Sequence, residues 1–394
     1  MEINKIYCGD VLEVLKTFPD ESVDCIITSP PYWNLRNYNV EEQIGLEPTL
    51  EEYLDRLFAV MKELKRVLKK TGVIFWNHGD SYGGGGNPND RKLAKGLKIP
   101  SIKDTSVPPK CLALQNYRFI LRCVDELGLT LRDVIIWAKK VWIAKENKTV
   151  GNAMPSSVRD RCTFTYEPIF MLVKDKKYYF DQHILRVPYT QPLNRWGGDK
   201  LIAKNKSEWD EDTGQQTYRD RDMRPNPMGA NRPNVWQINT EPTELPHFAC
   251  FPTELVKWLI LAGCPQWICK KCGKARERII EEEHRPNKPT ASPFAKTNQD
   301  LTGKINRASF YKDYRHKEFI GWTDCGCNAG WKPGIVLDPF MGAGTTAVVA
   351  QRLGRNWVGI ELNPEYVEMA YKRIKKELGL FNYLEEYKNV EWNQ

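Results

Sequence analysis

Short apolar stretches typical of β-strands alternate with helical patterns in the first third of this sequence. In chain order they are "NKIYCG" (strand), "DVLEVLKTF" (helix), "VDCIITS" (strand), residues 50–68 (helix) and "VIFWNHG" (strand). Gly72 is expected to close the long helix. The third stretch is continuously apolar, which is typical of a strand buried on both faces. This alternation predicts an α/β fold, a doubly wound and mostly parallel sheet with helices on its faces.

The same alternation returns later in the chain, but two irregular segments interrupt it. A helix is expected near 111–128, and further elements at "RDVIIWA", "TYEPIFMLV", "PTELVKWLILAG" and the block from residue 334 to 378. Residues 181–240 are rich in Pro, Asn, Asp, Arg and Trp, and residues 273–324 are polar and charged. We expect both segments to be insertions into one large domain. A third interruption, "GDSYGGGGNPNDRK", has four consecutive glycines and is expected to be a mobile loop.

Composition limits the class of protein further. The 394 residues are 41% hydrophobic, enough for a sizeable core, while a mean hydropathy of −0.55 and the lack of a long uncharged apolar run argue against a membrane span. The first residues lack the pattern of a secretory signal. Eleven cysteines without such a signal are expected to be reduced thiols in a cytoplasmic protein. The net charge of +8 suits a polyanionic partner but does not demand one.

A glycine-rich turn follows an apolar strand near the C-terminal end. In "IVLDPFMGAGTTAVVAQRL", Asp338 ends the strand, and Gly342 and Gly344 lie in the turn that opens a helix. Glycines let the backbone approach a ligand, and the helix N-terminus offers N–H donors. No lysine follows the last glycine, so the turn is not a P-loop. The next strand ends at Glu361, where a carboxylate can accept hydrogen bonds from both hydroxyls of a ribose. Structural glycines alone would explain the turn, but acidic residues at two successive strand ends favour a nucleotide site.

The stretch "TSPPYW", residues 28–33, directly follows the apolar strand "VDCIIT". Taken alone, the motif predicts a proline-stiffened turn with two surface aromatics. "DPFMGAGTT" and the later "GIEL", together with "TSPPYW", resemble the amino-methyltransferases of DNA. The order of the motifs is similar to that of the permuted group, in which the catalytic motif precedes the cofactor motif. This resemblance covers most of the chain except residues 181–240 and 273–324.

The resemblance implies a Rossmann-like methyltransferase fold that binds S-adenosylmethionine, and it suggests a division of the chain. Residues 1–180 would form the catalytic half, 181–240 a target-recognition insert, 241–268 with 328–394 the cofactor-binding half, and 269–327 a zinc-knuckle excursion. Asp10 would accept a hydrogen bond from the cofactor's adenine amino group, although it is equally suited to capping the following helix. Phe340 would stack near the adenosine, and Phe251 would help to close the methionine end.

The catalytic motif suits transfer to an exocyclic amine, whose lone pair is delocalised into the base. Such a reaction needs hydrogen-bond acceptors and alignment with the methyl donor rather than a strong base. The Ser29 hydroxyl and the Pro30 carbonyl can supply the acceptors, Pro31 lacks an N–H and fixes the chain direction, and Tyr32 offers a face to a base rotated out of the duplex.

Ser29, preceded by Thr28, makes the motif similar to that of the cytosine-N4 enzymes of the family. Versions led by Asp or Asn usually mark adenine-N6 enzymes or, elsewhere, enzymes that modify protein glutamine or RNA. The predicted function is therefore site-specific methylation of the N4 amine of cytosine in duplex DNA. Three alternatives stay open: an adenine-N6 DNA methyltransferase, an RNA or protein methyltransferase, and an inactive DNA-binding protein of the same fold.

Four cysteines are grouped in two pairs. Cys269 and Cys272 have C-x2-C spacing, and Cys325 and Cys327 form a tighter C-x-C pair after a long insert. Four thiolates suit a structural, tetrahedral zinc site with no open position for catalysis. A disulfide is not expected without a secretory context.

The insert at 181–240 is the expected DNA-reading region. Arginines and lysines alternate there with tryptophans, which suits contacts to phosphates and base edges, although its acids make it nearly charge-balanced, as in an ordinary solvated insert. Double-stranded DNA is the expected partner and a membrane is not. A cognate restriction endonuclease and a free-standing regulatory role are both compatible with the sequence.

Overall fold

The computed structural model describes residues 1–38, 40–83, 106–153, 156–188, 228–241, 251–285 and 314–383. The chain divides into two compact units. Unit 1 comprises Met1–Phe180, Pro233–Ala275 and Cys327–Gln394, and unit 2 comprises Asp181–Arg232 and Arg276–Gly326. Most of the expected DNA-reading insert, residues 189–227, and the glycine-rich loop from residue 84 onward lie outside the described residues.

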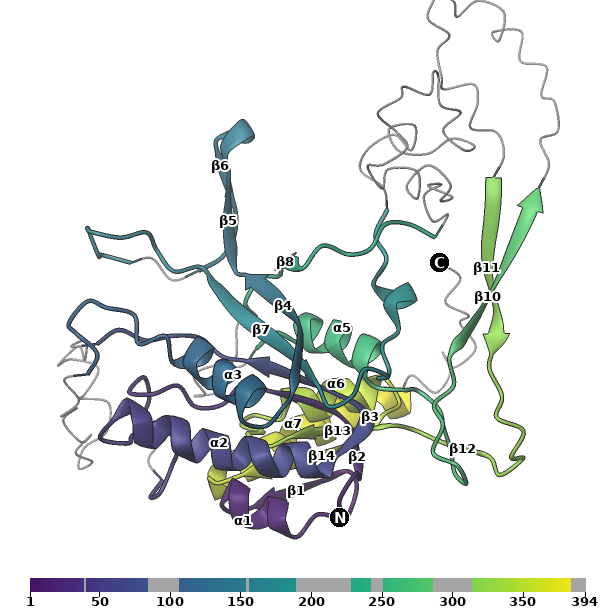
Figure 1. Cartoon of the computed structure of the whole chain (residues 1–394), viewed down its shortest axis with the longest axis horizontal. Helices are drawn as coiled ribbons and strands as arrows, with labels where there is room; N and C mark the ends of the chain where they lie inside the picture. The colour runs from purple at the N-terminus through teal and green to yellow at the C-terminus, as the bar shows by residue number, and fades with distance from the viewer. Residues whose placement is uncertain are drawn as a thin grey trace, which may run out of the picture. The chain divides into compact units, whose positions relative to one another are not determined.

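Unit 1 is built around an eight-stranded sheet with the order β1-β14-β13-β2-β3-β7-β4-β8 (Figure 1). The first five strands in this order run parallel, β7 is antiparallel to both of its neighbours, and β8 is parallel to β4. In chain order the strands are β1 (Lys5–Cys8), β2 (Val23–Thr28), β3 (Leu68–Asn77), β4 (Thr130–Ala138), β7 (Tyr166–Val173), β8 (Val235–Gln237), β13 (Ile335–Asp338) and β14 (Asn356–Glu361). The predicted mostly parallel sheet is confirmed.

Helices cover both faces of this sheet (Figure 1). The neighbours α1 (Val11–Lys16), α2 (Leu50–Val67) and α3 (Gln115–Asp125) form one layer, and α5 (Thr253–Gly263), α6 (Thr345–Arg352) and α7 (Pro364–Tyr383) form the other. Successive residues of β3 pack alternately against the two helical layers. Trp76 packs with Phe119 of α3, whereas Phe75 lies so close to Gly263 of α5 that a Cβ there would be 2.5 Å from its ring. The doubly wound arrangement predicted from the alternation is therefore present.

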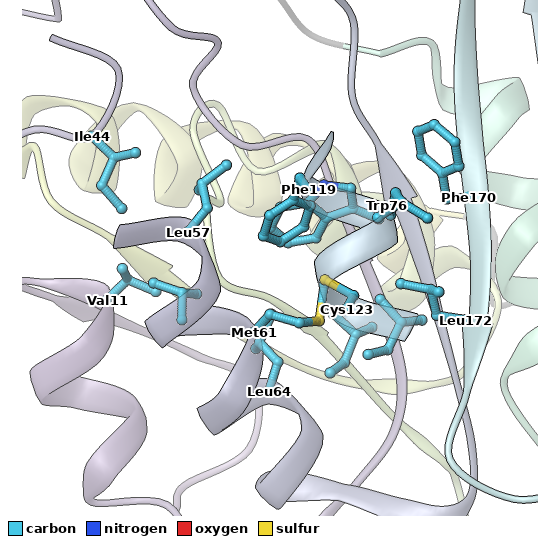
Figure 2. Packing of buried hydrophobic residues seen from close by; sticks show 14 of the residues in the cluster. Val11, Ile44, Leu57, Met61, Leu64, Trp76, Phe119, Cys123, Phe170 and Leu172 are labelled. Carbon is cyan, nitrogen blue, oxygen red and sulfur yellow. The ribbon is translucent and has the colours of Figure 1, made fainter. Parts of the chain in front are cut away.

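The core between the sheet and the first helical layer explains the spacing seen in the sequence (Figure 2). Leu57, Met61 and Leu64 recur on one face of α2 and are fully buried. The rings of Trp76 and Phe119 stack with their centroids 5.1 Å apart. Strand β2, with all six residues buried, fits the continuous apolar run that predicted it.

The expected end of α2 at Gly72 is wrong. The helix ends at Val67, Leu68 is already extended, and Gly72 lies inside β3. A Cβ on Gly72 would lie 2.5 Å from the Leu68 side chain and 2.9 Å from the Asp24 carbonyl oxygen. This glycine therefore permits close packing at the start of the strand rather than terminating the helix.

Two chain segments that are far apart in the sequence meet where β13 pairs with β2. Asp24, buried in β2, accepts a hydrogen bond of 2.9 Å from the Ile335 backbone N–H through Oδ2. Its Oδ1 forms an ion pair with Lys69 at 2.6 Å. A buried carboxylate with a partner on each oxygen thus joins two strands that lie more than 300 residues apart in the sequence.

The described part of the chain contains three two-stranded antiparallel ribbons that the sequence did not reveal. The shortest pairs β9 (Ile268–Cys269) with β12 (Trp331–Lys332). Strands β5 (Lys140–Ile143) and β6 (Lys148–Gly151) form a hairpin that extends away from the end of β4 (Figure 1). In unit 2, β10 (Arg278–Arg285) pairs with β11 (Tyr314–Trp322). Side chains of the β5–β6 and β10–β11 ribbons, such as Trp142 and Ile320, are largely exposed. These strands therefore lack the apolar pattern of a buried strand that would have identified them. Among the described residues, no helix combines the length and apolar character needed to span a membrane.

Candidate active site

The predicted site residues gather at one edge of the sheet. The carboxyl ends of β1, β14, β13, β2 and β3 meet there, together with the amino end of the antiparallel β7. A pocket opens at this edge. Its lining includes eight of the predicted residues: Asp10, Ser29, Pro31, Phe251, Asp338, Phe340, Gly342 and Glu361. Pro30, which is buried, Tyr32 and Gly344 are not among the described residues that line it.

Asp338 organises the turn from inside. Its carboxylate is 1% exposed and accepts hydrogen bonds from the hydroxyls of Thr28 (2.7 Å) and Thr346 (2.6 Å) and from the Phe340 backbone N–H (3.1 Å). Burial raises the pKa of Asp338 to about 6, and the three hydrogen bonds oppose that rise. The residue therefore ties β13 to the end of β2 and to the start of α6.

Glu361 and the glycine turn are directly connected. The Gly342 backbone N–H donates to Glu361 Oε2 at 2.7 Å, and the Asn363 N–H donates to Oε1 at 2.9 Å. Burial raises the pKa of Glu361, while these bonds lower it. Gly344 has φ +78°, and a Cβ there would lie 2.9 Å from the Ala370 Cβ, so this position requires glycine. Each carboxylate oxygen keeps a lone pair that a hydroxyl donor in the pocket can use.

Asp10 caps a helix and also lies at the pocket. Its Oδ1 accepts from the backbone N–H groups of Leu12 (2.9 Å) and Glu13 (3.1 Å), which makes it the N-cap of α1. The side chain also lines the pocket, opposite chain segments that begin at Asp338. The cap uses one oxygen, so the other is available to a ligand.

The Ser29–Tyr32 motif, predicted to be catalytic, is held by a carboxylate that the sequence did not single out. Ser29 Oγ lies 3.2 Å from the Tyr32 hydroxyl, which donates to Glu167 Oε2 at 2.9 Å. Asn77 Nδ2 donates to the same oxygen at 3.0 Å, and Lys139 forms an ion pair with Oε1. Burial, and then the charge of Glu167, raise the pKa of Tyr32 well above its usual value.

A second chain of hydrogen bonds holds the motif from the other side. The Tyr53 hydroxyl donates to the Pro31 carbonyl oxygen at 2.8 Å and lies 3.0 Å from His78 Nε2. Trp76 Nε1 donates to His78 Nδ1 at 3.3 Å. Since an indole N–H can only donate, His78 Nδ1 is the acceptor. His78 Nε2 therefore carries the ring hydrogen and donates it in a hydrogen bond to the Tyr53 hydroxyl oxygen. Burial lowers the pKa of His78 to about 3, so the ring is neutral at physiological pH.

Sequence reasoning missed these supporting side chains, although a signal for them exists. Asn77 and His78 are polar residues that follow the apolar run of β3, and Glu167 precedes the apolar run of β7. Once β7 is known to be antiparallel, its first residues must lie beside the ends of the parallel strands. The direction of β7 was the missing information, since an α/β pattern by itself predicts parallel neighbours.

The four grouped cysteines lie together. The sulfur atoms of Cys269, Cys272, Cys325 and Cys327 are all within 4.8 Å of one another. The Lys271 backbone N–H points to Cys269 Sγ at 3.4 Å, and Gly273 adopts φ +71° directly after the first pair. The two pairs are thus arranged as a compact group of sulfur donors.

Comparisons with known proteins agree with this geometry. The sequence profile of the family N6_N4_Mtase, described as DNA methylase, matches residues 23–266 and 330–372. The chain is 32% identical to the type II methyltransferase M.Cfr9I of Citrobacter freundii over 96% of this chain and 90% of the relative. It is 30% identical to M.SmaI of Serratia marcescens, over 94% of this chain and 90% of that protein.

Two further similarities are more distant. The DNA adenine methyltransferase YhdJ of Escherichia coli (strain K12) is 26% identical over 95% of this chain and 83% of its own length. The solved structure of the PvuII DNA methyltransferase (cytosine-N4-specific) aligns with 98% of this chain and 93% of its own, at 18% identity and a TM-score of 0.47. The family match and the similarity to relatives such as M.Cfr9I and M.SmaI show that the chain belongs to the DNA methylase family N6_N4_Mtase, and it is an S-adenosylmethionine-dependent DNA amino-methyltransferase.

Proposed function

We propose that this protein methylates the N4 amine of cytosine at a specific site in duplex DNA, with the target base rotated out of the helix. One observation carries the proposal. Ser29 and Pro31 of the catalytic motif line the same pocket as Asp10 and Glu361, so a methyl donor and an amine would share one pocket.

The residues around the pocket suit S-adenosylmethionine, which supplies the methyl group when bound. Glu361 presents oxygens to ribose hydroxyls, Asp10 presents one to the adenine amino group, and Phe340 and Phe251 add aromatic surface. On the amine side, Ser29 Oγ accepts a hydrogen bond from the target N–H. Such a bond draws electron density back to the nitrogen and orients its lone pair for the transfer.

The choice of cytosine depends on the neutral hydroxyl of Ser29 at the first position of the motif. A second candidate, adenine-N6 methylation, is supported by the similarity to the adenine methyltransferase YhdJ along 95% of this chain. An inactive DNA-binding role is less well supported because the pocket and both motifs are intact, and an RNA or protein substrate is less well supported because the matching family is described as DNA methylase.

Incubation with labelled S-adenosylmethionine and, in separate reactions, mixed-sequence duplex DNA, RNA or protein, followed by digestion and identification of the labelled product, tests the proposal. We expect N4-methylcytosine as the labelled product. N6-methyladenine would instead establish the second candidate, and label recovered only in RNA or protein would contradict both. Unlabelled nucleosides from every substrate would support the inactive alternative.

The partner proposed for this reaction is double-stranded DNA, and the β5–β6 hairpin is a candidate contact besides the insert at 181–240. The hairpin follows the carboxyl end of β4, at the edge of the sheet where the pocket opens. It carries Lys140, Lys145 and Lys148, together with Trp142, whose exposed fraction is 64%. Cations beside an exposed aromatic suit a phosphate backbone. The relatives named type II methyltransferases support a cognate restriction endonuclease as a second partner.

We also propose a structural zinc ion at the cysteine group. Zn–S bonds of about 2.3 Å place tetrahedral sulfurs about 3.8 Å apart, which the four thiols reach with a small contraction from their present limit of 4.8 Å. The Lys271 N–H directed at Cys269 Sγ would stabilise a thiolate. A bound ion would hold together two cysteine pairs that come from separate stretches of the chain.

Metal analysis of the purified protein should find about one zinc per chain. Cys272→Ser should lose it and lower the midpoint of thermal unfolding, because the energy of metal binding contributes to folding. Cys111→Ser, which changes an exposed cysteine outside the group, is the matched control and should retain the ion. Wild-type protein that stays free of zinc after preparation with excess zinc would refute the site.

A further inference from the structure

The chain of contacts from Ser29 through Tyr32 to Glu167 has a defined direction. A carboxylate can only accept, so the Tyr32 hydroxyl hydrogen goes to Glu167 Oε2 at 2.9 Å. The raised pKa of Tyr32 keeps that hydrogen in place at neutral pH. The Tyr32 oxygen is then an acceptor in its 3.2 Å contact with Ser29 Oγ, and Ser29 must be the donor.

Glu167 is itself fixed from two neighbouring strands. Asn77, the last residue of β3, donates to Oε2 at 3.0 Å, and Lys139, which follows β4, forms an ion pair with Oε1. The side chain of Glu167 is only 16% exposed, and that of Lys139 is 24% exposed. Three donors on two oxygens leave the carboxylate little freedom to turn away from Tyr32.

Close packing holds Tyr32 in the same position. Its ring lies against the backbone of Gly79, where a Cβ would be 2.7 Å from Tyr32 Cε2, and its centroid is 5.4 Å from that of His78. The phenol can therefore neither rotate away from Glu167 nor exchange its partner without displacing the end of β3.

We infer that Glu167 is a positioning residue which, through Tyr32, directs the hydroxyl hydrogen of Ser29 away from the pocket and makes Ser29 Oγ a pure acceptor toward the target amine. The inference rests on the proposed role of Ser29. An amine offers two N–H donors and one lone pair, and a Ser29 hydrogen pointed at that lone pair would block the atom that must attack the methyl group. Glu167 removes this competing orientation.

Single-turnover methyl transfer, with DNA and S-adenosylmethionine both saturating, tests the inference in Tyr32→Phe, Glu167→Gln and the double variant. Each single variant should slow transfer about 10²-fold, the size of effect expected when a reacting group loses its orientation. The double variant should be no slower than Tyr32→Phe alone, because Glu167 acts through Tyr32. The Kd of S-adenosylmethionine should change less than about twofold.

Glu21→Gln is the matched control, since it also neutralises a carboxylate paired with a lysine, Lys174, and is expected to keep the wild-type rate. A Glu167→Gln rate equal to wild type would overturn the inference, and so would losses that multiply in the double variant, which indicate a structural role. If Glu167→Gln does not fold, the transfer rate of Tyr32→Phe alone tests the inference, because this variant keeps the contacts of Glu167 with Asn77 and Lys139. A wild-type rate in Tyr32→Phe would then overturn it. An inactive wild-type protein would instead count against the proposed function.

Discussion

Ser29→Ala should reduce methyl transfer about 10²- to 10³-fold, the range seen when a single preorganised hydrogen-bonding group is removed from an active site. The hydroxyl lies beside Tyr32 and lines the pocket, so its loss removes the acceptor that orients the target amine. Binding of S-adenosylmethionine should be retained within about twofold, since the cofactor contacts proposed here come from β1, β13 and β14. Transfer rates and calorimetric binding measured on the same preparation separate the two effects.

Ser22→Ala provides the matched control for this variant. Ser22 lies immediately before β2, whereas Ser29 lies immediately after it, so the control removes the same hydroxyl at the opposite edge of the sheet. Its Oγ donates to the Pro19 carbonyl at 2.7 Å and does not approach the pocket. Unchanged turnover in Ser29→Ala would refute the assigned role of the motif, even if DNA methylation itself were established.

Glu361→Ala should weaken S-adenosylmethionine binding about 10²-fold. The substitution removes the oxygens proposed to accept from the ribose, and it also frees the Gly342 N–H, which Glu361 Oε2 now holds at 2.7 Å. Hydrogen bonds to a charged group contribute about 1.5–3 kcal/mol each, and about 2.7 kcal/mol corresponds to a hundredfold change in Kd. Isothermal titration with S-adenosylmethionine and with its demethylated product measures the loss.

Glu368→Gln controls for the removal of charge in this region. Glu368 lies on α7, pairs with Lys372 at 2.7 Å and is 69% exposed, so cofactor affinity should be unchanged. The affinity of Glu361→Gln for S-adenosylmethionine should lie between the affinities of Glu361→Ala and Glu368→Gln. Its amide keeps one acceptor oxygen but turns its NH2 group toward a backbone N–H donor. Wild-type affinity in Glu361→Ala would exclude this carboxylate from the binding site.

The fold was largely predictable because its signals are local. The apolar run of β2 and the helical spacing of Leu57, Met61 and Leu64 each identify an element without knowledge of the rest. Gly72 shows the limit of this reasoning. A glycine after a helix normally marks its end, yet here the Leu68 side chain occupies the space that a Cβ would need, a tertiary contact that no local pattern encodes.

The candidate site, like the fold, was predictable where local signals sufficed and unpredictable where tertiary contacts decide. Asp338 and Glu361 end parallel strands, and Asp10 and Ser29 come just after two others, so the rule for strand ends in α/β folds was sufficient to bring them together. The roles predicted for the Pro30 carbonyl and the Tyr32 ring stay predictions, but the structure adds that Pro30 is buried and that the Tyr32 hydroxyl donates to Glu167. Which side of a loop a residue presents depends on its partners, and those partners come from strands with no recognisable motif.

The pairing of β1 with β14 has a consequence for how the protein is made. Trp357 donates its backbone N–H to the Asn4 side chain across 353 residues of sequence, and β1 has β14 as its neighbour in the described sheet. During synthesis, the strand that precedes Asp10 can therefore form this pairing only after β14 has also left the ribosome. Because Asp10 follows β1 and Glu361 ends β14, the pocket that both residues line can form only after residue 361 has been added, which is more than 300 residues after the Ser29–Tyr32 motif.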